Sequence, residues 1–315
     1  MKDLSNISSS AAVSAVVEAE SDRQRIDNFL LRHCKGVPRS HIYRILRTGE
    51  VRVNSRRVDA TYRVREGDRV RIPPIRVAGR GTGKLPAPAV ELPVLLEDDW
   101  LLAVDKPAGM AVHGGSGVSF GVIERMRSAR PELKRLELVH RLDRETSGVL
   151  LLAKKRVALL ALHAALREGR AEKSYIALVK GKWRGEERRI DLPLRKYLTS
   201  AGERRVSVDA QGRASITVFR PLRQGRSCTL LSADLHTGRT HQIRVHLAHL
   251  GYPIAGDDKY GDFDWNRELS RQGLKRMFLH AAQMSFDHPV TGARLTVVSP
   301  LPAELKRVVT ELTEA

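Results

Sequence analysis

Apolar residues recur at helical spacing in two segments near the start of the chain, residues 21–32 and 39–48. Such spacing gives each segment one apolar face and predicts two amphipathic helices. The apolar faces consist of Ile26, Phe29 and Leu30 in the first segment and Ile42, Ile45 and Leu46 in the second. Residues 51–54 and 62–72 also alternate apolar and polar positions, with a turn at residues 66–68, and this alternation is typical of half-buried strands and a hairpin. The pattern predicts a small helix-helix-strand domain over residues 21–75.

The larger part of the chain mixes short strand-like runs with helical periodicity. The strand-like runs are residues 100–104, 148–153, 175–179, 216–219, 228–232 and 295–298. Helical spacing is found in residues 157–167, 240–250 and 305–312. Because strands and helices do not alternate regularly, the fold class expected for residues 94–315 is α+β, with a mixed, mostly antiparallel sheet flanked by helices.

Composition suggests where the domains begin and end. Residues 1–20 are rich in Ser and Ala, and we expect them to form a disordered tail. Residues 76–93 are rich in Gly, Pro and Ala and poor in large apolar residues, which is typical of a linker. The expected organisation is therefore a tail (1–20), a small domain (21–75), a linker (76–93) and a larger domain (94–315).

The charge of the chain is strongly positive, with 55 Lys and Arg against 36 Asp and Glu and a net charge of +19. Residues 39–71 alone carry ten arginines and four acids. A solvated charged surface is the ordinary explanation for such a run, but an excess of one sign on every predicted element favours binding to nucleic acid. An anionic membrane is less favoured, because the arginines do not gather on an amphipathic helix with aromatic anchors.

Membrane and secretion signals are absent from the sequence. No run of 18 apolar residues occurs, and the first residues lack the basic and apolar regions of a signal peptide. The two cysteines, Cys34 and Cys228, give neither a disulfide framework nor a paired-cysteine metal motif. We therefore expect a cytoplasmic protein without a membrane partner.

The densest group of reactive side chains lies in residues 140–148, just before the apolar run 149–153. It contains Asp143 flanked by Arg141 and Arg144. A loop that leads into a buried strand can hold a reactive group rigidly. A nearby arginine keeps a carboxylate ionised, as a nucleophile requires. From spacing alone, however, a structural ion pair of Asp143 is the more frequent explanation.

Five histidines near the C-terminal end raise the question of a metal site. They are His236, His241, His246, His249 and His280. Their spacing does not fit an HExxH motif, and no cysteine joins them. We expect no bound metal, and roles for these histidines as hydrogen-bonded scaffold or RNA contacts.

Several stretches of the chain resemble two known families. The stretches RIDNFL (25–30), RSHIYRILRTGEVRVN (39–54) and VREGDRVRIP (64–73) resemble an S4-type RNA-binding domain. The stretch HRLDRETSGVLLLAK (140–154) resembles the signature of the RluA-type pseudouridine synthase family. Further stretches resemble that family in the same order: DKPAGMAVHGG (105–115), EKSYIALVKG (172–181), LHTGRTHQIRVHLAHLGYPIAGDDKYG (235–261) and FLHA (278–281).

The resemblance to the synthase family implies that Asp143 is the catalytic carboxylate. It also implies that Tyr175 stacks its ring on the target uracil, with an ordinary core tyrosine as the alternative. An arginine should keep Asp143 ionised and aimed. Arg244 is the favoured partner, and Arg239 is the competing candidate.

Four further residues receive substrate-binding roles from the two resemblances. Arg141 is expected to occupy the place of the flipped base in the RNA, which suits a planar guanidinium, with a surface phosphate contact as the alternative. Leu279 is expected to line the uracil pocket, with a plain core leucine as the alternative. In the S4-like domain, the second helix is expected to contact the RNA backbone through Arg44 and Arg47.

The implied function is the isomerisation of uridine to pseudouridine in large-subunit ribosomal RNA. The uracil is detached at N1 and rejoined at C5 after leaving the base stack, without net oxidation or hydrolysis, so no cofactor is expected. Two alternatives stay open, namely the same chemistry on transfer RNA and a non-catalytic RNA-binding factor in ribosome assembly. Nothing in the sequence requires more than a monomer.

Overall fold

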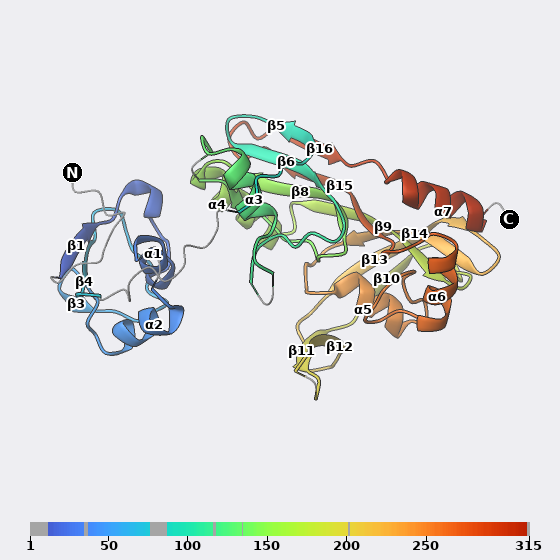
Figure 1. The fold of residues 1–315 in the computed structure, drawn as a ribbon, viewed down its shortest axis with the longest axis horizontal. Helices are drawn as coiled ribbons and strands as arrows, with labels where there is room; N and C mark the ends of the chain where they lie inside the picture. Colours follow the sequence, from blue (N-terminus) through green and yellow to red (C-terminus); the bar gives the residue numbers. More distant parts are fainter. Residues whose placement is uncertain are drawn as a thin grey trace. The chain divides into compact units, whose positions relative to one another are not determined.

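The computed structural model divides the chain into two compact units, residues 1–85 and 86–315 (Figure 1). The residues that it describes are 12–34, 37–75, 87–115, 118–133, 135–200 and 202–313. Most of the predicted linker, residues 76–86, lies outside the described residues. Among the helices of the described ranges, none is long and apolar enough to cross a membrane.

The first unit packs two helices against a four-stranded sheet (Figure 1). Its elements are β1 (Val13–Val16), a 3-10 turn (Ala19–Ser21), α1 (Ile26–His33), α2 (Arg39–Arg47), β2 (Arg52–Val53), β3 (Arg56–Arg57) and β4 (Arg69–Ile72). The strand order is β1-β4-β2-β3. Phe29 and Leu30 of α1 and Ile42 and Ile45 of α2 are buried in one core with Val70 of β4, so the apolar faces predicted for the two helices are confirmed.

The prediction of a disordered tail over residues 1–20 is wrong for its second half. Val13–Val16 pairs antiparallel with Arg69–Ile72, and Ala15 and Val17 are buried. The short run of alternating apolar residues supplies the outer strand of the sheet and covers an edge of β4 that would otherwise be unpaired. Residues 1–11 lie outside the described residues.

The first helix also begins later than its periodicity predicts, at Ile26 rather than Ser21. Arg23 adopts a positive φ of 57°, which separates the 3-10 turn from α1. A left-handed residue cannot be part of a right-handed helix, so α1 cannot include Arg23 or reach back to Ser21.

The second unit is built on a ten-stranded mixed sheet (Figure 1). Its strands are β5 (Val94–Glu97), β6 (Leu101–Lys106), β7 (Glu137–Leu138), β8 (Ser147–Ala153), β9 (Glu172–Lys180), β10 (Arg188–Asp191), β11 (Leu194–Leu198), β12 (Arg204–Val208), β13 (Ile216–Gln224), β14 (Cys228–Leu235), β15 (Leu279–Asp287) and β16 (Arg294–Val298). Its helices are α3 (Val122–Ala129), α4 (Arg156–Arg167), α5 (Gln242–His249), α6 (Phe263–Arg271) and α7 (Ala303–Thr313).

The main sheet has the strand order β10-β13-β14-β9-β15-β8-β6-β5, with β16 paired to β15 and β7 paired to β8. All of its strand pairs are antiparallel except β8 with β15. The predicted α+β class with a mostly antiparallel sheet flanked by helices is therefore confirmed. Strands β11 and β12 form a separate two-stranded hairpin that extends away from the main sheet (Figure 1).

Side chains alternate between the two faces of the main sheet along each strand, and helices cover both faces. On one face, Tyr175 and Ala177 belong to a core shared with Met126 of α3 and Ile243 of α5. On the other face, α4 packs beneath β8, and α6 and α7 pack against Leu178 of β9. Tyr175 therefore points to the face that carries α5.

Lys106, the last residue of β6, is fully buried among backbone carbonyls. Its Nζ atom donates hydrogen bonds to the carbonyl oxygens of Pro107 and Met110, both at 2.8 Å, and of Arg144 at 3.1 Å. These three acceptors use all three N–H groups of an ammonium. Burial lowers the pKa of Lys106 to about 7. The hydrogen bond to the Arg144 carbonyl oxygen thus holds the turn that follows Asp143 against the end of β6.

Replacing the Lys106 ammonium should destabilise the second unit. Lys106→Met preserves most of the side-chain volume but leaves three carbonyls without their donor. We expect the free energy of unfolding to fall by about 2–4 kcal/mol, measured by urea denaturation, because a buried unsatisfied polar group is costly. Lys182→Met, at an exposed position, is the control and should change little. Equal stability of the two variants would contradict this role of Lys106.

Gly148 allows the parallel pair of β8 and β15 to form. Its φ is +110°, and a Cβ there would lie 2.2 Å from the carbonyl oxygen of Ala281 in β15. Gly169 also has a positive φ, +73°, but no atom within 4 Å of an added Cβ. Both glycines have a positive φ, which a side chain disfavours, and only Gly148 adds a clash with a neighbouring strand.

This difference gives a matched stability test. Gly169→Ala should lower the free energy of unfolding by about 1–2 kcal/mol, the cost of a left-handed alanine. Gly148→Ala should lower it by about 1–3 kcal/mol more, because the strand backbones must move apart. Chemical denaturation of both variants measures the difference, and indistinguishable values would show that the pair tolerates a methyl group.

Candidate active site

Asp143 lies in the loop between β7 and β8. Leu142 is buried in the core, and the amide of Thr146 donates to the Asp143 carbonyl oxygen at 3.2 Å, which closes a turn. On the N-terminal side of the loop, the Nε2 atom of His140 accepts a hydrogen bond from the amide of Leu151 at 3.1 Å. Burial lowers the pKa of His140 to about 3, so this ring is a neutral acceptor. Both sides of the loop are thus anchored to β8.

Arg244 of α5 is the cation beside Asp143. Its Nη1 atom lies 3.5 Å from Oδ2 of Asp143, and its side chain is 4% exposed against 28% for Asp143. Arg239, the competing candidate, instead donates from Nε to the carbonyl oxygen of Ala214 at 3.1 Å. The geometry therefore supports Arg244 as the partner of Asp143.

The guanidinium of Arg244 is held by a second carboxylate that sequence reasoning missed. Its Nε and Nη2 atoms donate to the two oxygens of Asp257, both at 2.7 Å. Asp257 is fully buried and also accepts the backbone amides of Lys259 and Tyr260. Such a bidentate pair fixes the plane of the guanidinium and leaves Nη1 directed at Asp143. The acidic pair in the stretch GDDKYG was the available signal.

Tyr175 is buried on β9. In the sheet, β15 lies between β9 and β8, the strand that follows the Asp143 loop. Burial and the negative charge of Asp143 raise the pKa of its phenol. The hydroxyl therefore stays protonated at neutral pH and can take part in proton transfer only as O–H.

His241 lies directly before α5 and was not singled out as a site residue from sequence. Its Nε2 atom is 3.9 Å from Oδ2 of Asp143, and its Nδ1 atom is 2.9 Å from the hydroxyl of Tyr260. The ring of Tyr260 also lies beneath the Arg244 guanidinium, 5.1 Å from centroid to Cζ. No sequence pattern distinguished His241 from the neighbouring histidines.

Asp143 opens onto a cavity of about 620 Å³, a size suited to a nucleotide. The cavity brings together six predicted site residues: Arg141, Asp143, Tyr175, Arg239, Arg244 and Leu279. Its lining also includes further cations, which are Arg167, Lys173 and Lys196. Among the described residues that line it, Asp143 is the one acid. A single carboxylate surrounded by cations suits a polyanionic substrate that must approach one reactive oxygen.

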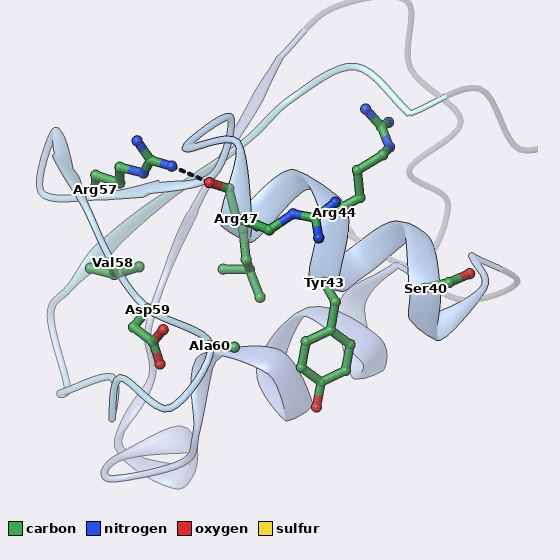
Figure 2. Close-up of a pocket in the computed structure, with 9 residues that line it drawn as sticks. Ser40, Tyr43, Arg44, Arg47, Arg57, Val58, Asp59 and Ala60 are labelled. Carbon is green, nitrogen blue, oxygen red and sulfur yellow. Dashed lines mark hydrogen bonds between the residues drawn. The ribbon is translucent and has the colours of Figure 1, made fainter.

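The remaining predicted site residues, Arg44 and Arg47, lie in the first unit. They line a cavity of about 710 Å³ together with Tyr43 and Arg57 (Figure 2). The guanidinium of Arg57 donates to the backbone carbonyl of Arg47 (Figure 2). A substitution of the Arg47 side chain therefore leaves both groups of this hydrogen bond in place. The two arginines thus form a basic surface within the first unit.

Two of the other histidines, His246 and His280, are hydrogen-bonded parts of the fold, whereas His236 lines the cavity. His246 is buried between Ser215 and Thr217, and His280 lies between Ser147 and Ser299. The Ser147–His280 pair resembles a nucleophile and its base, but both residues are buried outside the cavity lining. Within the described ranges, no cluster of three His, Cys, Asp or Glu residues could hold a metal ion.

Comparisons with known proteins show the family of the chain. Residues 100–249 match the RNA pseudouridylate synthase family, and residues 24–70 match the S4 domain. The chain is 50% identical to ribosomal large subunit pseudouridine synthase C of Yersinia pestis over 92% of both chains. It is 49% identical to the protein of that name from Escherichia coli strain K12, over 95% of this chain and 96% of the relative.

Solved structures give the same result for the fold. Human RNA pseudouridylate synthase domain containing 4 aligns with a TM-score of 0.57 and 26% identity, covering 70% of this chain and 92% of that one. The human protein named domain containing 1 aligns with a TM-score of 0.57 and 25% identity, covering 67% and 84%. The chain belongs to the RluA family of RNA pseudouridine synthases and carries an N-terminal S4 domain.

Proposed function

We propose that this enzyme converts uridine to pseudouridine in large-subunit ribosomal RNA, with Asp143 as its catalytic carboxylate. The observation that carries the proposal is the position of Asp143, the one acid among the described residues that line a cationic cavity, 3.5 Å from a guanidinium and beside a buried tyrosine. The names of the relatives from Yersinia pestis and Escherichia coli support the choice of RNA.

The cavity suggests how a uridine is handled. The base leaves the RNA stack and enters the cavity, at a cost of a few kcal/mol that binding must offset. Arg141 is exposed at the cavity and can replace the base in the stack, while Leu279 and the ring of Tyr175 provide apolar contact with uracil. Arg239 and Lys173 can neutralise the adjacent phosphates.

The reaction breaks the N1–C1′ bond of uridine and forms a C5–C1′ bond. An ionised Asp143 assists this exchange either by attacking the ribose or by removing a sugar proton, and both routes begin with the carboxylate that Arg244 holds. The proton displaced from C5 must leave and N1 must gain one, and the protonated hydroxyl of Tyr175, which lines the cavity, can donate one of these protons as it accepts the other.

The central test is the Asp143→Asn variant, which removes the charge and keeps the shape. We expect pseudouridine formation in purified large-subunit RNA to fall by about three orders of magnitude or more, as for other groups that touch the reacting atoms. The product is counted by mass spectrometry of RNA digests. Asp258→Asn is the control, because the exposed Asp258 also contacts Arg244, at 3.3 Å, but lies outside the cavity lining.

The outcomes separate the competing functions. Equal activity of wild type and Asp143→Asn would remove Asp143 from the mechanism. Pseudouridine made only in transfer RNA would show that transfer RNA is the substrate. RNA binding without any product from the wild type would favour an assembly factor.

The basic surface on α2 gives a second test. Arg47→Glu should weaken binding of ribosomal RNA by about tenfold at low salt and should make the affinity less dependent on salt, because phosphate contacts release counterions. Filter binding at several salt concentrations measures both effects. Arg32→Glu carries the same charge change at an exposed residue outside that surface and should have less effect. A large loss of thermal stability in Arg47→Glu would contradict its surface role.

A further inference from the structure

His241 holds an unusual position between the catalytic loop and the rest of α5. Its backbone is left-handed, with φ 55° and ψ 20°, a region in which His, Asn and Asp are enriched among non-glycine residues. Its side chain is 15% exposed, less than the 28% of Asp143. One ring nitrogen faces Asp143 and the other faces Tyr260.

Hydrogen-bond accounting at Tyr260 fixes the tautomer of this ring. The Tyr260 oxygen accepts the backbone N–H of Val206 in β12 at 2.9 Å. Its own hydrogen needs an acceptor, and Nδ1 of His241, at 2.9 Å, is the one that the described residues provide. A nitrogen that accepts carries no proton, so the single proton of a neutral imidazole is on Nε2. Nε2 is the atom that faces Asp143.

Burial favours the neutral form of the ring. Burial lowers the pKa of His241 from its usual value, and the cations Arg244 and Lys259 act in the same direction, while Asp143 opposes them. A neutral ring can donate from Nε2 and accept at Nδ1 at the same time, as the geometry at Tyr260 requires.

We propose that His241 is a positioning residue of the synthase, which aims its Nε2–H at the Asp143 carboxylate because Tyr260 fixes its tautomer. The distance of 3.9 Å between Nε2 and Oδ2 is longer than a hydrogen bond. Contacts of this kind often tighten only when the substrate is bound. The catalytic consequence rests on the proposed function, whereas the tautomer does not.

The same contacts connect the β11–β12 hairpin to Asp143. The hairpin is attached to the loop around Tyr260 by an ion pair between Glu203 and Lys259 and by a hydrogen bond from Arg205 to the Lys259 carbonyl at 2.8 Å. Lys196 on β11 lines the active-site cavity. One element therefore supplies a cation for the substrate and the backbone N–H that orients Tyr260.

Two substitutions of His241 separate the roles of its two nitrogens. Asparagine tolerates the left-handed backbone and places its amide near the position of Nδ1, but it has no donor at the position of Nε2. Glutamine reaches the position of Nε2 with an N–H. A structural role would be harmed by both changes, whereas a donor role is rescued by glutamine alone.

The kinetic test uses single-turnover reactions of the full chain on ribosomal RNA. We expect the rate constant of His241→Asn to fall about tenfold or more with unchanged RNA affinity, and that of His241→Gln to stay within about threefold of wild type. Tyr260→Phe keeps the ring beneath Arg244 and removes the hydroxyl, so its rate should fall between the two. Equal losses in Asn and Gln, or a loss in affinity alone, would overturn the proposal.

A second measurement is independent of activity. Nitrogen-15 NMR of histidine-labelled free protein reports which ring nitrogen carries the proton, and the His241 signal is the one missing from His241→Asn. We expect a neutral ring protonated on Nε2 in the wild type and a mixture of tautomers in Tyr260→Phe. A proton on Nδ1, or a charged ring at pH 7.5, would refute the inference even if the enzyme is active. An inactive wild type with the expected tautomer would instead refute only the proposed function.

Discussion

The buried ion pair between Arg244 and Asp257 is the interaction on which the geometry of the proposed active site depends. A guanidinium that is 4% exposed must be compensated by charge and hydrogen bonds, and Asp257 supplies both through two bonds of 2.7 Å. Because Asp257 meets this requirement, Asp143 does not have to be buried to stabilise Arg244. Asp143 can remain 28% exposed to the cavity while it still faces a fixed cation. One carboxylate thus holds the guanidinium in place, and the other is left partly exposed to the cavity.

The main sheet brings the other residues of the proposed site close to this ion pair. Strands β9, β15 and β8 are neighbours, and they carry Tyr175, Leu279 and the loop of Asp143, respectively. The parallel pairing of β8 with β15 brings Ser147 opposite His280, so the start of one strand lies beside the start of the other. Since α5 covers the same face as Tyr175, Arg244 meets Asp143 from a distant part of the sequence.

Sequence patterns predicted the elements whose periodicity is long and clear. The helices at residues 39–48, 157–167 and 305–312 and the six strand-like runs correspond to structure, because burial on one face repeats along each of them. The short strand β1 and the β11–β12 hairpin depend on distant partners, so local pattern could not reveal them. The family motifs pointed to Asp143 and Arg244, which the fold brings to 3.5 Å from each other. The contacts of Asp257 and His241 could not be foreseen, because only the fold creates them.

The two units have separate hydrophobic cores, one formed around α1 and α2 and the others around the main sheet. A chain of two units with their own cores does not have to unfold in one all-or-none step, so a single melting temperature is not a well-defined property of it. The effect of an amino-acid change in one core is therefore best measured on a probe within that unit.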